Sequence, residues 1–317
     1  MNLKDAVLIA EKQIRCYIHE TPLDFSVELS EITGIKVYLK CENTQYTGSF
    51  KVRGAFNKLL SLSSVQKKLG VVTASTGNHG TAVAFGLKKL NIPGIIFVPE
   101  NASLAKVKNI RNHDVPLKFY ATDCLETETY AREYAKKHNM LYISPYNDVQ
   151  VISGQGTIAV EMIRQLNTID DILVPIGGGG LIAGIAGYIK SVSPETQIIG
   201  CLPQNSPVMF ESIKAGKIVD IITTATLSDA TAGGIEARSI TFDLCKDFVD
   251  DYILVSEQEI KDAMNILIKT QRILVEGASA VSLASLLKNI ERFRDRHVVI
   301  LLSGGNISVD TLNAVLS

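Results

Sequence analysis

DILVPIGGGGLIAGIAGYIKSV, residues 171–192, places an apolar strand pattern, four consecutive glycines and a helical pattern in direct succession. A continuous apolar run before a helix is typical of a strand that is covered on both faces. Four glycines cost backbone entropy and leave no Cβ atoms in the turn between the two elements. The stretch therefore predicts a strand–loop–helix unit of a parallel sheet, whose backbone N–H groups could hold a phosphate group.

The same alternation of strand and helix patterns runs along the rest of the chain. The strand-like runs are KVYLKC, GVVTAS, GIIFVP, LKFYAT, LYISPY, DILVPIG, QIIGCLP, DYILVS and HVVILLS. Helical spacing of apolar residues is found between them, as in LETETYAREYAKKHN and QEIKDAMNILIKTQRIL. This order predicts an α/β fold of two domains with twisted, mostly parallel sheets and a cleft between them.

The composition narrows the classes of function and partner. The chain has 317 residues, of which 46% are hydrophobic, and its net charge is -1. We therefore expect neither nucleic acid nor a membrane surface as a partner. The N-terminal MNLKDAVLIAEKQI resembles a surface helix and not a signal peptide, which predicts a cytoplasmic protein. Five scattered cysteines without a C-x-x-C pair argue against disulfides and a zinc site.

The loop TGSFKVRGA, residues 47–55, follows the strand-like VYLKCE. It places Phe50 and Lys51 between Gly48 and Gly54, in what we expect to be a tight turn at the end of the strand. Most lysines are solvated surface charges. An amine held in such a turn is instead a candidate nucleophile for carbonyl chemistry.

The loop STGNHG, residues 75–80, lies between a strand pattern and a helical pattern. Free N–H groups at the start of a helix can hold an anion, and Ser75, Thr76 and Asn78 could add side-chain donors. The alternative is an ordinary N-cap with a glycine turn.

The glycine run matches neither of two common nucleotide loops. No Gly-Lys-Ser/Thr follows it, so it is not a Walker A loop. Gly178, Gly180 and Ala183 match G-x-G-x-x-A, but the next strand, QIIGCLP, has no acidic residue at its end to bind a ribose. We interpret the loop as a site for a lone phosphate group.

The fourth loop, LLSGGN at residues 301–306, places Ser303 at the end of the strand HVVIL, facing the cleft; the alternative is a cap for the helix VDTLNAVL. A nucleophilic lysine, an anion loop, a phosphate loop and a hydroxyl together fit a cofactor that has an aldehyde and a phosphate. Pyridoxal 5'-phosphate is such a cofactor, with Lys51 as its Schiff-base partner.

HETPL, LSEITGIKVYLKCEN, TGSFKVRGA, STGNHG, VPIGGGGLIAG and LLSGGN occur in this order across nearly the whole chain. With this set the sequence resembles the catabolic threonine/serine dehydratases and serine racemases, which are fold type II, tryptophan-synthase-like pyridoxal-phosphate enzymes. The resemblance implies a large domain of residues 1–47 and 148–317, a small domain of residues 48–147, and a homodimer. Because the sequence ends one helix after LLSGGN, we expect no C-terminal regulatory domain.

The resemblance also implies roles for individual residues. Lys51 would carry the cofactor and act as the base at Cα, while Phe50 would pack against the pyridine ring. Asn78 would bond the 3-oxygen, and Ser303 would bond the ring nitrogen. The phosphate would be bound by Gly177, Gly178, Gly179, Gly180 and the Leu181 N–H. The substrate-carboxylate loop would contain Ser75, Thr76, Asn78 and His79. The cofactor would be bordered by Gly234 and Glu276.

The activity implied by the resemblance is β-elimination of water from L-threonine or L-serine, which yields a 2-oxo acid and ammonia. A serine racemase and a dehydratase of another 3-hydroxy amino acid stay open, and so does a nucleotide-dependent binding protein. Thr76 stands where the racemase pattern has serine and many dehydratases have alanine, so it is a candidate second acid–base group. Leu202 and Val208 stand where metal-binding relatives would need oxygen ligands, so no metal is expected.

Overall fold

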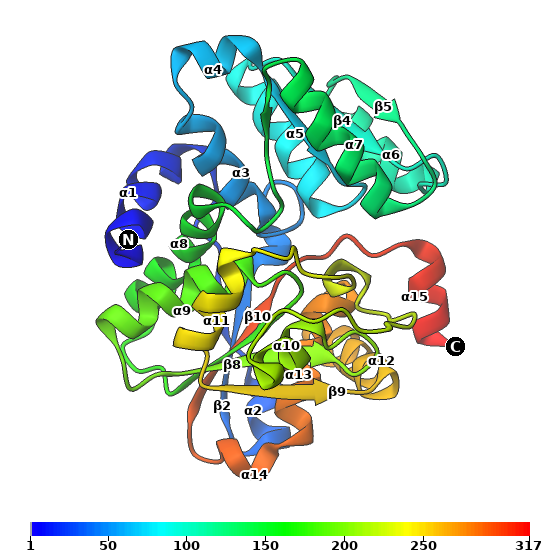
Figure 1. The fold of residues 1–317 in the computed structure, drawn as a ribbon. Helices are drawn as coiled ribbons and strands as arrows, with labels where there is room; N and C mark the ends of the chain where they lie inside the picture. The colour runs from blue at the N-terminus through cyan, green and yellow to red at the C-terminus, as the bar shows by residue number, and fades with distance from the viewer. Residues whose placement is uncertain (1) are drawn as a thin grey trace.

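The computed structural model describes residues 2–317 and contains two sheets with helices packed on them (Figure 1). The larger sheet has the strand order β1-β2-β10-β7-β8-β9, and the smaller sheet has the order β5-β4-β3-β6. All neighbouring strands are parallel except β1 and β2. The strands are Leu23–Phe25 (β1), Lys36–Cys41 (β2), Val71–Ala74 (β3), Gly94–Val98 (β4), Leu117–Phe119 (β5), Leu141–Tyr142 (β6), Asp171–Pro175 (β7), Gln197–Pro203 (β8), Asp251–Val255 (β9) and His297–Leu302 (β10).

Each of the nine strand-like runs of the sequence contains one of these strands, so the mostly parallel α/β fold is confirmed. The helices are Leu3–Ile14 (α1), Val27–Thr33 (α2), Lys51–Leu60 (α3), Ser64–Leu69 (α4), Asn78–Leu90 (α5), Leu104–Arg111 (α6), Cys124–Lys137 (α7), Val149–Gln165 (α8), Gly180–Val192 (α9), Val208–Ala215 (α10), Ile240–Phe248 (α11), Glu257–Ile266 (α12), Gly277–Lys288 (α13), Ile290–Phe293 (α14) and Val309–Leu316 (α15). Short 3₁₀ turns are Arg15–Tyr17 (η1), Glu42–Thr44 (η2) and Asp229–Thr231 (η3), and Leu267–Gln271 (η4) is a π-helical turn after α12.

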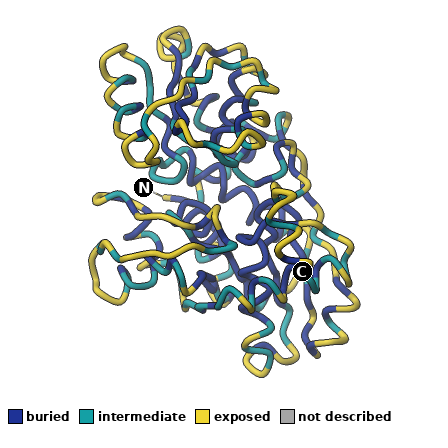
Figure 2. Tube along the Cα trace, turned by 90° about the vertical axis from the view of Figure 1, so that its right-hand side faces the viewer, coloured by how far each residue is buried: buried dark blue, intermediate teal, exposed yellow. Residues whose placement is uncertain are grey.

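Both faces of the larger sheet are covered. On one face Leu39, Leu173 and Ile300 pack with α12 and α13. On the other face Val174 and Val299 pack with α8, α9 and α11. Figure 2 shows the buried segments running through the interior of the molecule. The near-continuous apolar sequence of these strands follows from this double coverage.

The smaller sheet forms a separate layer between α5 and α7. Val71 and Ile96 pack with α3 and α5, and Val72 and Phe97 pack with α7. All four of its strands lie within residues 48–147, and all strands of the larger sheet lie outside this range. The boundaries of the small domain themselves stay a prediction.

The start of α3 corrects the expected conformation of TGSFKVRGA. Lys51 is the first residue of the helix and not part of a glycine-flanked turn, because Gly54 lies inside α3. A Cβ atom on Gly54 would lie 2.8 Å from the Val151 carbonyl oxygen of α8. This glycine therefore permits close packing of α3 on α8.

A buried charge network connects β2, η2, α3 and α8. Arg53 donates to both oxygens of Glu42 at 2.7 and 2.8 Å and to both oxygens of Glu161 at 2.7 and 2.8 Å. The Lys40 Nζ donates to Glu161 at 2.6 Å, and all four side chains are fully buried. The Thr21 hydroxyl of HETPL donates to Glu42 at 2.6 Å. The network thus fixes α3 two residues after Lys51.

Candidate active site

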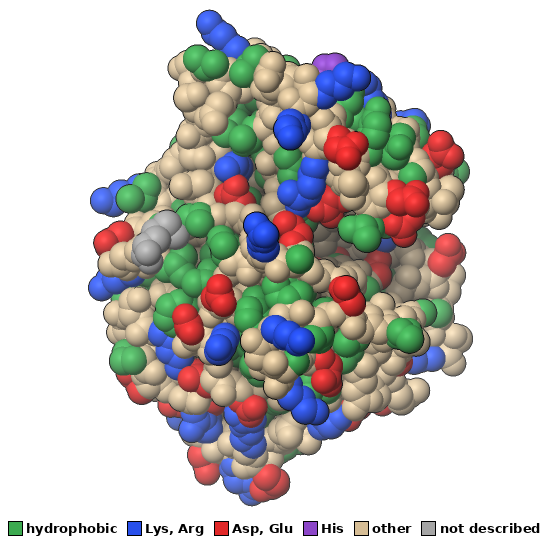
Figure 3. Space-filling view, in the orientation of Figure 1, with side chains coloured by type: hydrophobic (Ala, Val, Ile, Leu, Met, Phe, Trp, Pro, Cys, Tyr) green, Lys and Arg blue, Asp and Glu red, His purple; other side chains and the backbone are tan. Residues whose placement is uncertain are grey.

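One cavity of about 330 Å³ lies where the ends of β3, β7 and β10 meet the start of α3. The surface is hollowed between the upper and lower lobes, at the right of Figure 3. Every residue that the sequence predicted for the site lines this cavity: Phe50, Lys51, Ser75, Thr76, Asn78, His79, Gly177, Gly178, Gly179, Gly180, Leu181, Gly234, Glu276 and Ser303. The four loops are therefore brought together as expected, although their residues come from distant parts of the chain.

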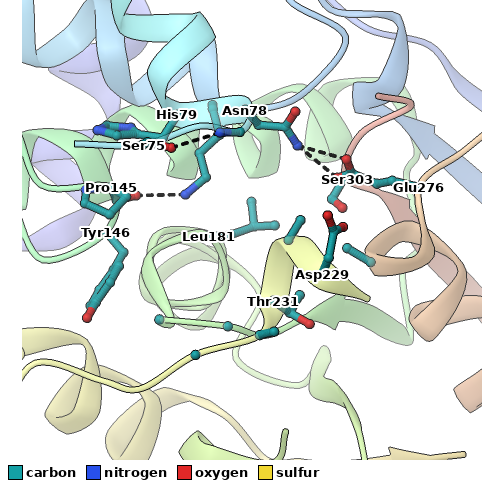
Figure 4. Close-up of a pocket in the computed structure, with 18 of the residues that line it drawn as sticks. Ser75, Asn78, His79, Pro145, Tyr146, Leu181, Asp229, Thr231, Glu276 and Ser303 are labelled. Carbon is teal, nitrogen blue, oxygen red and sulfur yellow. Dashed lines mark hydrogen bonds between the residues drawn. The ribbon is translucent and has the colours of Figure 1, made fainter. Parts of the chain in front are cut away.

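The Lys51 amine is held at the wall of the cavity. Its Nζ donates to the Pro145 carbonyl oxygen at 2.9 Å, a bond that Figure 4 draws, and lies 5.2 Å from the centre of the Phe50 ring. Burial lowers the pKa of Lys51 to about 8, although the charge of Glu276 acts in the opposite direction. A large fraction of this amine is therefore neutral at weakly alkaline pH, which is the state that attacks an aldehyde.

The glycine loop offers a group of N–H donors to the cavity. Among the described residues 2–317, the N–H groups of Gly177, Gly178 and Gly179 have no hydrogen-bond acceptor. They are followed by the first turn of α9, whose N–H groups have no partner within the helix. The Thr241 hydroxyl donates to the Gly178 carbonyl oxygen at 2.6 Å and so fixes the plane of the next peptide. This arrangement suits a phosphate group.

The absence of side chains in this loop has a second cause that the sequence did not indicate. A Cβ atom on Gly178 would collide with the ring of Tyr146. Gly179 has a φ of 85° and is the N-cap of α9, and its Cβ atom would lie 2.8 Å from the Met209 Cε. Packing behind the loop therefore requires glycine independently of any ligand.

The loop at the start of α5 differs from an ordinary N-cap. The N-cap residue is Gly77, which has no side chain to bond the first turn. The Ser75 hydroxyl accepts from the Gly77 N–H at 3.3 Å, and the Thr76 hydroxyl has no partner within the described part of the chain. The two hydroxyls and the free N–H groups of the turn therefore line the cavity as candidate donors to an anion.

His79 is buried, and its ring is engaged away from the centre of the cavity (Figure 4). Its Nε2 lies 3.3 Å from the Ile143 carbonyl oxygen, so this nitrogen carries the hydrogen. Burial, together with the charge of Lys51, lowers the pKa of His79 to about 3. The imidazole is therefore neutral, and it adds no positive charge to the loop.

Asn78 and Glu276 meet across the cavity. The Asn78 Nδ2 donates to both carboxyl oxygens of Glu276, at 3.0 and 2.9 Å. Its Oδ1 accepts from the Asn306 Nδ2 at 2.7 Å, and Asn306 also donates to the Thr47 carbonyl oxygen at 2.9 Å. Burial raises the pKa of Glu276 to about 7, although the hydrogen bonds from Asn78 act to lower it. Asn306 was not identified from the sequence, although it lies within the LLSGGN motif.

Ser303 is buried at the end of β10 and lies against the start of α3. Its carbonyl oxygen accepts from the Phe50 N–H at 3.0 Å, and its hydroxyl oxygen lies 3.3 Å from that of Ser279. The N-cap of α15 is Ser308, so Ser303 does not have the alternative role of capping the last helix.

Several further residues that line the cavity were missed by the sequence reading. They come from α6, from the loop after β6 and from the irregular segment around η3: Lys106, Asn109, Tyr146, Asp229 and Thr231. Lys106 and Asp229 form an ion pair of 2.8 Å at the rim. Tyr146, Asp229 and Thr231 lie in a loop or a short turn without periodicity, and Lys106 and Asn109 lie on α6 outside the quoted motifs, so the sequence carried no signal for them.

Among residues 2–317, no group of three or more His, Cys, Asp and Glu side chains is placed to hold a metal ion. In the same range, no helix combines the length and the apolar character that crossing a membrane requires. The independence from metals stays a prediction.

The donors of the cavity fit pyridoxal 5'-phosphate. The N–H groups of the glycine loop and the first turn of α9 suit its phosphate. The Lys51 amine suits its aldehyde, and the hydroxyl of Ser303 and the amide of Asn78 suit the polar atoms of its ring.

Comparison with known proteins agrees with this fit. L-threonine dehydratase catabolic TdcB of Escherichia coli is 37% identical over 313 residues, which are 98% of this chain and 95% of the relative. L-threonine ammonia-lyase of Thermotoga maritima is 38% identical over 308 residues, which are 97% of this chain and 76% of the relative. The solved structure of maize serine racemase matches with a TM-score of 0.93 and 33% identity, covering 99% of this chain and 96% of that one.

A family model described as pyridoxal-phosphate dependent enzyme matches residues 14–304. The match includes Lys51, the glycine loop and Ser303, and the two sheets have the arrangement of the fold type II enzymes. The chain therefore belongs to the family of pyridoxal-phosphate-dependent enzymes.

Proposed function

We propose that this protein removes water from L-threonine or L-serine by β-elimination and releases a 2-oxo acid and ammonia. The names of the Escherichia coli and Thermotoga maritima relatives support a threonine-deaminating activity. The observation that carries the proposal is the position of the Lys51 amine, which has a pKa of about 8 and shares one cavity with the unpaired N–H groups of the glycine loop.

Bound pyridoxal 5'-phosphate would supply an aldehyde for amines and a ring that takes up negative charge from Cα. The Lys51 amine would hold the cofactor at its aldehyde, and as a free amine it would remove the proton from Cα of the amino acid. Its hydrogen bond to Pro145 orients the free amine. Because burial favours the neutral amine, Lys51 accepts this proton at weakly alkaline pH.

The other residues bind and orient. Gly177, Gly178 and Gly179 would hold the phosphate through their N–H groups, with the first turn of α9 beside them. The N–H groups at the start of α5 and the hydroxyls of Ser75 and Thr76 hold the substrate carboxylate.

The groups around the ring keep it in place and set its charge. Phe50 would pack on the ring. Asn78 would donate to its 3-oxygen in place of one of the two Glu276 oxygens that its Nδ2 contacts in this structure. Ser303 would donate its hydroxyl to the ring nitrogen, which would stay unprotonated, in contrast to a nitrogen beside a carboxylate. A weaker electron sink suits elimination, because the leaving group departs without a long-lived carbanion.

Serine racemisation is the second candidate activity. The match to maize serine racemase and the unpartnered Thr76 hydroxyl both favour it. Racemisation needs a second acid–base group that returns a proton to Cα on the opposite face. A β-branched hydroxyl with restricted rotamers is a poor candidate, so we place racemisation second.

The test is Lys51→Ala, assayed by the visible absorbance of the bound cofactor and by 2-oxo acid release from a panel of 3-hydroxy amino acids. We expect both signals to be lost. The matched control is Lys58→Ala, on the same helix, where Lys58 pairs with Asp148 at 2.6 Å and does not line the cavity. A Lys51→Ala variant that still releases 2-oxo acid, or a wild-type protein that releases none, contradicts the proposal.

We further propose a cytoplasmic homodimer with residues 48–147 as its small domain. These points rest on the family resemblance. Analytical ultracentrifugation of the purified protein tests the dimer, and a monomer across the micromolar range contradicts it.

A further inference from the structure

Glu236, which lies between η3 and α11, collects contacts from four residues on the side of the smaller sheet. Its Oε1 accepts from the Arg132 Nη2 at 2.8 Å and from the Ser144 hydroxyl at 3.1 Å. Its Oε2 accepts from the Asn147 Nδ2 at 2.8 Å, and its own N–H donates to the Tyr146 hydroxyl at 2.9 Å.

Three of the four contacts surround Pro145. Ser144 precedes it, Tyr146 and Asn147 follow it, and the carbonyl oxygen of Pro145 accepts the hydrogen bond from the Lys51 amine. The Asn147 N–H also donates to the Ser144 hydroxyl at 3.1 Å, which closes the turn around Pro145. Glu236 therefore contacts the chain on both sides of Pro145, through its carboxylate at Ser144 and Asn147 and through its N–H at Tyr146.

Within residues 2–317, the Glu236 carboxylate accepts from Arg132, Ser144 and Asn147 and not from Lys51. The contacts that link it to the amine run through the segment that holds the Pro145 carbonyl group. An amine that donates one hydrogen to this carbonyl oxygen directs its lone pair away from it.

We propose that Glu236 is a positioning residue for Lys51. Through Ser144, Tyr146 and Asn147 it holds in place the Pro145 carbonyl group that accepts from the Lys51 amine. The proposal rests on Lys51 being the nucleophile, as proposed above. It assigns to the segment around η3 a role in orienting the amine as well as in lining the cavity.

The variant Glu236→Gln keeps the size of the side chain, but it places an NH₂ group opposite side chains that donate to Glu236, which are Arg132, Ser144 and Asn147. A matched control is Glu128→Gln, because Glu128 accepts from the same Arg132 at 2.7 Å but contacts neither Ser144 nor Asn147. A second test exchanges donor and acceptor in Glu236→Gln/Asn147→Asp. There, the new amide can donate to the new carboxylate, which can still accept from the Ile240 N–H as Asn147 does at 3.0 Å.

The first measurement is the rate at which the full chain, freed of cofactor, becomes yellow after pyridoxal 5'-phosphate is added. The second is kcat and KM for L-threonine, together with Tm. We expect Glu236→Gln to lower the capture rate and kcat about tenfold, the factor that a loss of about 1.4 kcal/mol produces, with KM within about twofold. Glu128→Gln should retain both rates, and the double variant should recover most of the loss.

The proposal is overturned if Glu236→Gln and Glu128→Gln behave alike, or if the double variant is as slow as Glu236→Gln. A loss confined to Tm, with unchanged capture rate and kcat, also overturns it, since a merely structural role would give this result. The capture rate does not depend on the substrate. A wild-type protein that captures the cofactor but deaminates neither threonine nor serine would therefore refute the proposed function and leave this test intact.

Discussion

Replacing Glu161 with glutamine should destabilise the protein by about 3–5 kcal/mol without changing the cavity. Glu161 is fully buried and accepts hydrogen bonds from the side chains of Arg15, Lys40 and Arg53 and from the Thr21 N–H. A glutamine side chain has nearly the same shape, but it carries no charge and presents an NH₂ group to these donors.

The magnitude follows from two independent arguments. Burial alone would raise the pKa of Glu161, but the charges of Arg53 and Lys40 outweigh it and lower this pKa from 4.5 to about 2. At about 1.4 kcal/mol for each pKa unit, this difference corresponds to about 3 kcal/mol. Removing one partner of a buried ion pair generally costs about 3–5 kcal/mol, because the other charge stays buried. Here Arg53 would retain only Glu42 as a charged partner, and Lys40 would lose the carboxylate that its Nζ contacts.

Scanning calorimetry at pH 7, with and without cofactor, measures the effect. With about 2.1 cal/mol/K of unfolding entropy per residue and 317 residues, the entropy is about 0.7 kcal/mol/K, so Tm should fall by at least about 4 °C. The control is Glu11→Gln at the rim of the network, where the partners Arg15 and Arg164 are 30% and 48% exposed and the loss should be about 1 °C. The stabilisation by Glu161 is complete above about pH 4.5 and is lost as the pH falls toward about 2. A Glu161→Gln variant that melts within 1 °C of the wild type would refute the reasoning.

Three further predictions concern the cavity. Gly179→Val should lower the free energy of unfolding by about 2–5 kcal/mol, and Tm with it, even without cofactor. The reasons are the positive φ at this position and the contact of a new Cβ atom with Met209. Equal melting of variant and wild type would contradict this. Glu276 has a pKa raised from 4.5 to about 7, so the wild type should lose stability as the pH rises from about 4.5 to 7, and Glu276→Gln should flatten this part of the Tm curve; parallel curves would count against it. With L-serine, pyruvate should form faster than D-serine, and Thr76→Ala should remove the residual D-serine; equal rates in the wild type, with D-serine lost in the variant, would make racemisation the main activity.

Local patterns in the sequence were sufficient for the elements and for the class of fold. The runs from KVYLKC to HVVILLS each contain a strand, and VDTLNAVL coincides with α15. Periodicity and turn residues are properties of neighbours in the chain, so they can be read without the fold. Three elements departed from their patterns. Helix α3 begins at Lys51, where a turn was expected. The three residues of β1 are too few to show alternation, and α12 passes into a π-helical turn that ends at Gln271 and is capped by Arg272, which has a φ of 57°.

The sequence also located about half of the residues that line the cavity, because ligands bind where strands end and helices begin. Lys51, Asn78, the glycine loop and Ser303 are all found there. Family roles could be transferred to these positions because each lies within a quoted motif. Tyr146, Asp229 and Asn306 had no assigned role, and loops without periodicity gave no sign of their direction.

The chemical state of the site was decided by the tertiary structure alone. The contact of Asn78 with Glu276 joins residues 198 positions apart, and the contact of Lys51 with Pro145 joins residues 94 positions apart. The fold removes water from the amine and so lowers its pKa to about 8, which leaves about half of it neutral at that pH, and the Pro145 carbonyl group orients it. Desolvation and hydrogen-bond geometry depend on which atoms surround a group in space, and no local pattern of residues specifies those neighbours.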